Sequence, residues 1–152
     1  MQNSFVADRT LTQALEKRSI SVPCLRGRML FKQGETPKGL YILKSGKASL
    51  VMKGENGVEV IHLTIGAGSI LGVPAVVTRE PYTLSAMACG GAEVSFTELT
   101  DFEDLMQAEP TLFPLVLAVL AAEVRAARIA FTGIMTKLRS RSSRHSGPAL
   151  SR

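Results

Sequence analysis

The segment from Gly68 to Ala86, GSILGVPAVVTREPYTLSA, combines two close glycines, an apolar run, an expected turn at Glu80-Pro81 and then small hydroxyl residues. A glycine backbone approaches an anion closely, so a loop of this composition could cradle a phosphate. Its one basic residue, Arg79, lies outside the glycine-rich part. The segment therefore leaves two interpretations open: a ligand pocket, or a pocket that has lost its ligand.

Catalytic and metal-binding patterns do not occur elsewhere in the sequence. A cupin-like metal site needs several histidines and a carboxylate, whereas this chain has only His62 and His145. We interpret His62 as a structural strand residue. Cys24 and Cys89 form no C-x-x-C pair and are expected to be reduced, partly buried thiols. Without a Ser-His-Asp, H-E-x-x-H or Walker-type pattern, we expect neither an enzyme nor a bound cofactor or metal.

Short β-prone runs separated by glycine or proline occupy the chain from Cys24 to Ser95. This spacing predicts an antiparallel sandwich or barrel. Asn56-Gly57 predicts a tight hairpin turn with positive φ angles. The runs are MLF (29–31), GLYIL (39–43), KASLVM (47–52), VEVIHLTI (58–65), SILGVPAVV (69–77), YTLSAMA (82–88) and AEVSF (92–96). Which face of VEVIHLTI points inward stays open.

Three helices are expected to flank the strands. The first covers residues 9–18 with Thr10 as its N-cap, and the second begins at Thr100 with Glu103 in a capping-box position. The third is long, from about 111 to 138, with Thr111 as its cap and Pro114 in the first turn.

The long helix has the clearest periodicity in the chain. Its apolar positions alternate four and three residues apart, which is typical of a coiled-coil seam. This pattern predicts a homodimer through the helix, although the same residues could pack on the chain's own strands. The stripe consists of Phe113, Leu117, Leu120, Val124, Ala127, Phe131, Ile134 and Leu138.

The positive charge is concentrated at the end of the chain. Five of the 18 basic residues lie in 137–152 with no acidic residue, which leaves 13 basic and 13 acidic residues elsewhere. We expect 139–152 to be a disordered basic tail and 1–138 to be one sensor domain with its helix. With no visible signal sequence and no apolar run long enough for a bilayer, a cytoplasmic location is expected.

The stretch Leu30–Leu50, LFKQGETPKGLYILKSGKASL, resembles the entry to the β-roll of cyclic-nucleotide-binding domains, with the pattern F-x-x-G-[DE]-x(4)-[LM]-Y-x-[IL]-x-x-G. The matching residues are Phe31, Gly34, Glu35, Leu40, Tyr41, Leu43 and Gly46. Over about residues 10–138 the layout is most similar to bacterial catabolite activator/FNR (Crp/Fnr) regulators. The resemblance implies a mainly β fold with flanking helices, a double-stranded β-helix (jelly-roll-like β-roll) followed by a dimerisation helix.

The resemblance also makes Gly68–Ala86 the equivalent of the family's phosphate-binding cassette. Gly68 and Gly72 match its glycines, but Val73 stands where the family has a ribose-binding glutamate. Tyr82 stands where the family has the phosphate-binding arginine, so a cyclic phosphate would lack its charged partner. Arg79 is the alternative phosphate partner. The expected ligand-lining residues are Leu71, Gly72, Val73, Pro74, Tyr82 and Thr83, with Arg128 and Thr132 approaching from the helix.

These residues predict a dimeric regulatory module that senses a small molecule, with a cassette that does not bind cAMP in the usual way. The alternative is a shortened Crp/Fnr-type transcriptional regulator that binds cyclic nucleotide or DNA. Because about 14 residues follow Leu138, a recognition helix does not fit there, and DNA binding by this chain alone is not expected.

Overall fold

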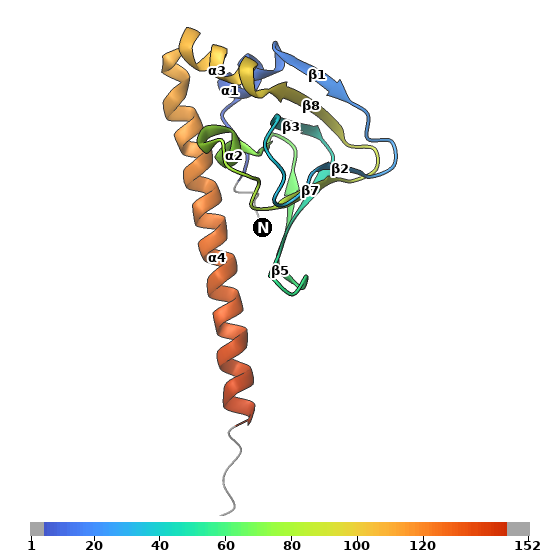
Figure 1. Cartoon of the computed structure of the whole chain (residues 1–152), viewed down its shortest axis with the longest axis vertical. Helices are drawn as coiled ribbons and strands as arrows, with labels where there is room; N and C mark the ends of the chain where they lie inside the picture. Colours follow the sequence, from blue (N-terminus) through green and yellow to red (C-terminus); the bar gives the residue numbers. More distant parts are fainter. Residues whose placement is uncertain (1–4, 146–152) are drawn as a thin grey trace, which may run out of the picture.

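The computed structural model describes residues 5–145 (Figure 1). Strands and short helices form a rounded body, and one long helix runs along its side and projects beyond it. The elements in chain order are α1 (Arg9–Glu16), β1 (Ser19–Val22), β2 (Arg28–Phe31), β3 (Gly39–Ser45), β4 (Lys47–Lys53), β5 (Glu59–Gly66), β6 (Ile70–Leu71), α2 (Val73–Thr78), β7 (Ser85–Ala88), β8 (Glu93–Glu98), α3 (Leu99–Ala108), the 3-10 turn η1 (Pro110–Leu112) and α4 (Phe113–His145).

The strands form two four-stranded antiparallel sheets, which confirms the predicted β-roll. One sheet has the order β1-β8-β3-β6 and the other the order β2-β7-β4-β5. Most paired strands are far apart in the chain, as when Leu40 of β3 lies opposite Thr97 of β8, and β4 with β5 is the one consecutive pair among the described strands. This double-sheet arrangement leaves a single interior between the sheets.

Two apolar clusters fill the molecule. The first lies within the roll and includes Phe31, Leu71, Tyr82 and Ala86. The second lies where the helices cover the roll, and its members are Leu11, Leu15, Leu40, Ile42, Ile70, Val73, Val76, Phe102, Leu105, Met106, Leu112, Val116 and Val119. The helices are therefore part of the same folded unit as the roll.

The run SILGVPAVV is not one strand, contrary to the prediction. Only Ile70–Leu71 pairs as β6, and the chain then turns into the helix α2. Gly72 has a φ of 90°, a left-handed conformation that ends the strand, and Pro74 suits the first turn of the helix that follows. A strand that the apolar pattern did not predict, β1, covers Ser19–Val22.

The predicted N-caps are also wrong. The cap of α1 is Asp8, whose carboxylate accepts a hydrogen bond from Thr10 N at 2.8 Å. The helix α3 begins one residue before Thr100, and its cap Glu98 makes no side-chain capping bond. Thr111 lies inside η1 and does not cap the long helix. Several short polar residues near a helix start compete for the cap, and sequence spacing alone does not choose among them.

The predicted hairpin joins β4 to β5. Gly57 N donates to Gly54 O at 2.9 Å, and Gly57 has a φ of 77°. Asn56 does not have the predicted positive φ; its side-chain oxygen instead accepts from Val58 N. On β5, Ile65 is buried, and Ile61 and Leu63 on the same face are partly buried. This is the inward face that the sequence analysis left open.

The long helix α4 extends seven residues further than predicted, because 139–145 continue as helix. The rest of the predicted tail, 146–152, lies outside the described residues. One face of α4 packs on the roll through Val116, Val119 and Ala126, and Leu112 of η1 is buried just before the helix begins. The helix is therefore an integral wall of the domain over its first half.

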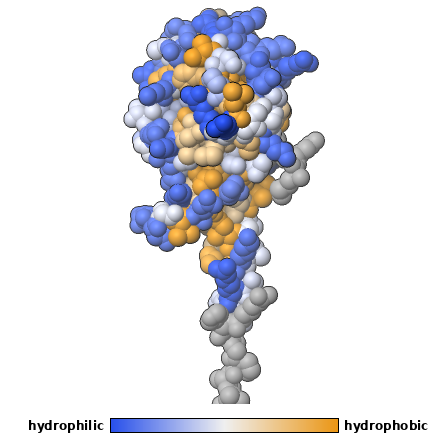
Figure 2. Space-filling view, turned by 90° about the vertical axis from the view of Figure 1, so that its right-hand side faces the viewer, coloured by the Kyte–Doolittle hydropathy of each residue, from blue (hydrophilic) through white to orange (hydrophobic). Residues whose placement is uncertain are grey.

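The neighbouring face of α4 carries the apolar stripe, and most of its side chains are exposed. Leu117 is 62% exposed, Val124 54% and Phe131 62%. Figure 2 shows apolar residues gathered where the helix leaves the roll, below a largely hydrophilic upper surface. Within the described residues, no helix combines the length and apolarity needed to cross a bilayer.

Candidate ligand site between the roll and the long helix

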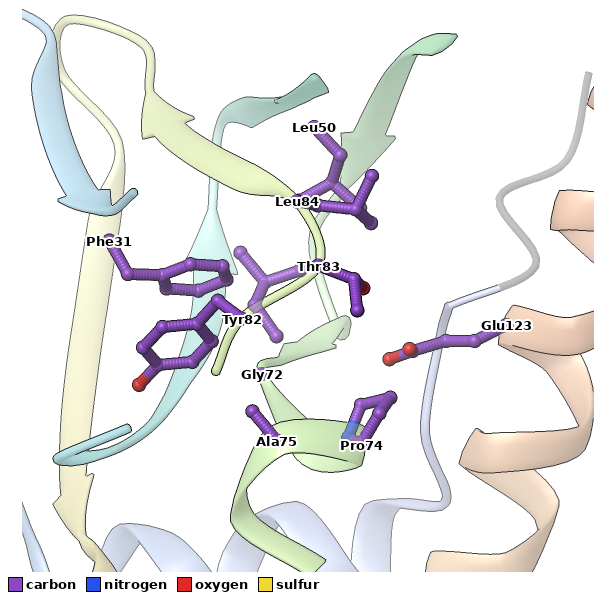
Figure 3. Close-up of a pocket in the computed structure, with 10 residues that line it drawn as sticks. Phe31, Leu50, Gly72, Pro74, Ala75, Tyr82, Thr83, Leu84 and Glu123 are labelled. Carbon is purple, nitrogen blue, oxygen red and sulfur yellow. The ribbon is translucent and has the colours of Figure 1, made fainter. Parts of the chain in front are cut away.

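The predicted cassette forms the floor of a small cavity inside the roll (Figure 3). The strand β6 ends at Gly72, α2 turns back, and the loop before β7 brings Tyr82 and Thr83 to the same place. A side chain at Gly72 would lie only 3.1 Å from the Tyr82 ring, in addition to requiring an unfavourable positive φ. Glycine is needed here because the aromatic ring packs directly against the backbone.

Tyr82 occupies this floor as a packed, hydrogen-bonded residue. Its ring stacks on Phe31 with a centroid separation of 4.0 Å, and its hydroxyl donates to Gly39 O at 2.6 Å. Burial raises the pKa of the Tyr82 phenol above its ordinary value, so the hydroxyl remains a donor. The Tyr82 hydroxyl therefore already donates its proton within the fold.

The resulting cavity has a volume of about 30 Å³, close to the share of one water molecule in the liquid. Typical small-molecule sites are about ten times larger or more. Five of the six predicted site residues line it, namely Leu71, Gly72, Pro74, Tyr82 and Thr83. The sixth, Val73, is 2% exposed and belongs to the cluster under the helices. Its side chain leaves from the other side of α2, because successive residues of a helix point in different directions.

The cationic side chains considered for this site lie elsewhere. Arg79 follows α2 in a left-handed conformation, with a φ of 60°, and its guanidinium pairs with the Glu103 carboxylate on α3. Arg128 and Thr132 are exposed on α4 and do not line the cavity. Among the described lining residues, the cavity therefore contains no cation to balance a phosphate.

The backbone at Gly68 is also engaged. Gly68 N donates to Leu43 O at 2.8 Å, and Gly68 O accepts from Ala7 N at 2.9 Å. Gly68 is thus a structural turn with a φ of 91° that ties β6 to β3 and to the N-terminal segment. Its N–H is not available to an anion in this conformation.

A larger groove of about 240 Å³ adjoins the cavity, between α4 and the sheet that contains β4 and β5. Pro74, Thr83 and Leu84 border both spaces, and so does Glu123 of α4. The other lining residues are apolar: Phe5, Met52, Ile61, Leu63, Leu120, Val124 and Ala127.

Glu123 is the functional candidate that the sequence analysis missed. Figure 3 shows its side chain reaching from α4 towards Pro74 and Thr83. Burial raises the pKa of its carboxyl to about 8, with no charged group offsetting the desolvation. In the sequence Glu123 lies just beside the apolar stripe and so looked like an ordinary flanking residue. A signal was nevertheless present, because it is the only acidic residue in α4.

The histidine and cysteines show no sign of a catalytic constellation in the described part of the chain. His62 lies on β5 with its ring 3.4 Å from the Glu59 carboxylate. Cys24 is buried, which raises the pKa of its thiol, and Cys89 is exposed rather than partly buried. Residues 5–145 contain no cluster of three potential metal ligands.

Comparisons with known proteins agree with this architecture. The family model for the cyclic nucleotide-binding domain matches residues 22–109. The cAMP-dependent protein kinase type II regulatory subunit of Drosophila melanogaster is 32% identical over 81 residues, which cover 53% of this chain and 21% of that protein.

Solved structures extend the similarity to the helices. The Thermus thermophilus catabolite activator protein matches with a TM-score of 0.63 and 26% identity, covering 89% of this chain and 61% of that one. The c-di-GMP-responsive regulator CLP of Xanthomonas campestris matches with a TM-score of 0.69 and 15% identity, covering 95% of this chain and 76% of that one.

The fold is thus that of a β-roll sensor domain with a long C-terminal helix. The chain belongs to the cyclic nucleotide-binding domain family, and its structural neighbours are Crp/Fnr regulators. It spans about a fifth of the curated kinase subunit and about three fifths of the Thermus regulator.

Proposed function

We propose that this chain is a regulatory module that senses a small molecule other than a cyclic nucleotide bound in the usual way. The observation that carries the proposal is Tyr82. It stands where the family's phosphate-binding arginine is expected, and its ring and hydroxyl are both engaged within the fold. A phosphate here would lose solvent without gaining a charged partner, which costs several kcal/mol or more.

Two further contacts support the same conclusion. Arg79, the alternative phosphate partner, pairs with Glu103 on the outside of the roll. Glu123 is the ionisable side chain of α4 that borders the cavity, and it offers a phosphate no positive charge. The Xanthomonas regulator, which has the same fold, responds to c-di-GMP. Proteins with this fold therefore do not all respond to the same ligand.

Isothermal titration calorimetry of the full chain with cAMP and cGMP tests the proposal. We expect neither heat of binding nor thermal stabilisation up to millimolar nucleotide. A dissociation constant in the micromolar range or tighter would overturn the proposal. The Glu103→Gln variant, which releases Arg79, is the companion sample, and it too is expected to remain without cyclic-nucleotide binding.

We further propose that the module acts as a homodimer through α4. The stripe exposes a row of large apolar side chains, which is unusual on the surface of a monomer. Its spacing suits a parallel coiled-coil seam. The adjoining groove places α4 next to the ligand site, so a bound molecule would alter how the helix packs. Analytical ultracentrifugation is expected to show a dimer at micromolar concentration; a monomer there would contradict it.

The proposed activity is regulatory rather than catalytic, and the module is expected to act in the cytoplasm. The fold and the cavity supply recognition and a movable helix, which suit a sensor. DNA binding by this chain alone is not part of the proposal.

A further inference from the structure

The groove along α4 is bordered on the helix side by residues of the apolar stripe. Leu120, Val124 and Ala127 line it together with Glu123, and β4 and β5 contribute to its opposite wall. A second helix that packs on the stripe would therefore also cover the groove. The side chain that such a helix would bring to the groove follows from the heptad positions of α4.

The spacing of the stripe assigns these positions. With Val124 at position a and Ala127 at position d, the stripe has the heptad pattern of a coiled coil. Glu123 then occupies position g and Arg128 position e, on opposite sides of the seam. In a parallel two-stranded coiled coil, position g of one helix faces the position e that lies five residues further along the other helix, and oppositely charged residues there form salt bridges.

Within one chain, Glu123 and Arg128 do not meet. Neighbours on a helix surface are three or four residues apart, whereas these two are five apart and separated by the stripe. Glu123 borders the roll beside Pro74 and Thr83, and Arg128 is exposed on the other side. Neither side chain has an ion-pair partner within residues 5–145.

From this arrangement we propose that α4 of a second copy of this chain covers the groove as a parallel, in-register coiled coil, in which Glu123 pairs with Arg128 of the partner subunit. The two-fold symmetry of such a dimer forms the pair twice. A guanidinium on a carboxylate forms charge-assisted hydrogen bonds, which are stronger than neutral ones. The inference rests on the proposed dimer and specifies its orientation, its register and the partner side chain that completes the groove.

The charge pattern of the helix favours this register over its neighbours. Glu123 is the only acidic residue in α4, so one position decides the match. A shift of one heptad in either direction would bring Ala121 or Met135 of the partner subunit opposite Glu123, and neither side chain carries a charge. The in-register dimer supplies a cation to both carboxylates.

The pair also gives the association a pH dependence. In the single chain, burial raises the pKa of Glu123 to about 8, so its carboxyl is largely protonated at pH 7. Among the described residues that line either space, the one other titratable side chain is Tyr82, whose hydroxyl donates to Gly39 O. An arginine beside the carboxyl lowers its pKa, so association releases the proton. Dimerisation of the wild type should therefore strengthen as the pH rises towards 8, and that of Glu123→Gln should not.

Charge reversal tests the pair while leaving the stripe intact. Glu123→Arg places arginine opposite arginine at both pairs, and Arg128→Glu places carboxylate opposite carboxylate. We expect each variant alone to dimerise about tenfold more weakly than the wild type, or worse, because like charges that face each other across an interface are costly. Analytical ultracentrifugation measures the dissociation constants. Arg125→Glu is the matched control, since it reverses an exposed charge at position b, away from the seam, and should leave the dimer unchanged.

Mixing the two reversed chains distinguishes a contact between subunits from an effect within one chain. In a heterodimer of Glu123→Arg and Arg128→Glu chains, both pairs again join opposite charges. A one-to-one mixture should therefore associate nearly as tightly as the wild type, and native mass spectrometry should show one chain of each kind in the dimer. A defect within a single chain would not be repaired by mixing.

Neutral variants provide a second measurement in case Glu123→Arg disturbs the fold. Glu123→Gln and Arg128→Gln should each weaken the dimer severalfold, and the double variant should be no weaker than the weaker single one, because both changes remove the same pair. Far-ultraviolet circular dichroism and thermal melting at low protein concentration confirm that each variant folds.

The inference is overturned if charge reversal leaves the affinity of the dimer unchanged, or if the mixture associates no better than its components. A wild-type chain that is monomeric at micromolar concentration would overturn both the inference and the proposed dimer. The proposed sensing function fails separately, through micromolar binding of cAMP or cGMP.

Discussion

The two faces of α4 contain similar apolar residues but differ in how much of each side chain is exposed. The inner face buries Val116 and Val119 to 5% and 3% exposure against the roll. The outer face leaves Leu117 and Val124 at 62% and 54% exposure, although these residues are just as apolar. The inner face contributes to the stability of the single chain, whereas the outer face leaves its apolar side chains exposed.

This difference shows why the helix could not be assigned one role from its periodicity. The first half is apolar nearly all round, so one stripe packs within the chain and another stays free. Glu123 lies at the edge between the two, beside the groove. Substitutions on the two faces should therefore separate folding from association.

The largest effect is expected from Val116→Asp. A charge in the cluster under the helices should lower the free energy of unfolding by about 4 kcal/mol or more, or prevent folding. Leu117→Asp is the matched control, because the neighbouring side chain is exposed. It should change the unfolding free energy of the monomer by less than about 0.5 kcal/mol. Urea denaturation measures the free energy of unfolding of both variants.

Sedimentation of the Leu117→Asp protein completes this comparison. The charge lies on the proposed seam, so the variant should be monomeric where the wild type is dimeric. An unchanged dimer would place the interface elsewhere, and strong destabilisation by Leu117→Asp would mean that the two faces are not distinct.

Glu123 should make the stability depend on pH. Between pH 4.5 and about 8 the folded chain keeps a proton that the unfolded chain has released, so raising the pH through this window destabilises the fold. We expect a loss on the order of 2 kcal/mol for the wild type. Urea unfolding at pH 5.5 and 8.5 measures it, and Glu123→Gln should show a smaller loss. Equal slopes for the two proteins would refute the assignment.

Neighbouring alanines test the same boundary on a smaller scale. Ala126 is 8% exposed and packs on the roll, so Ala126→Leu should overfill the contact and cost about 1–3 kcal/mol. Ala127 is exposed on the stripe, and Ala127→Leu should leave the monomer's melting temperature nearly unchanged. Thermal melts of both variants at low protein concentration decide whether the boundary lies between these two residues.

The smallest effect is expected at Glu103, away from α4. Its pair with Arg79 is largely exposed, so Glu103→Gln should cost less than about 1 kcal/mol. Chemical denaturation measures this cost. A loss several times larger would show that the pair fixes α2 against α3.

Most of the fold could be predicted from local patterns. Glycine-separated β-prone runs indicated the two sheets, and the motif around Phe31 and Gly46 indicated the family. The prediction was wrong where one apolar run suits either a strand or a helix. At Gly72, such a run changes from a strand into a helix. Apolar residues suit both buried strands and buried helices, so the run alone could not decide.

The structure brings most, but not all, of the expected site residues to one cavity. Five of the six expected residues meet at one cavity, but Val73 turns to the other cluster, and Glu123 enters from a helix that begins about thirty residues after the cassette. No local pattern connects these two segments.

The sequence by itself determined the roll, the long helix, the apolar stripe and the absence of the expected arginine at Tyr82. Only the tertiary structure decided that Tyr82 fills the cavity, that Arg79 turns away, and that Glu123 faces the groove. The physical reason is that residue type and spacing specify elements and turns locally, whereas burial and charge environment arise from segments far apart in the chain.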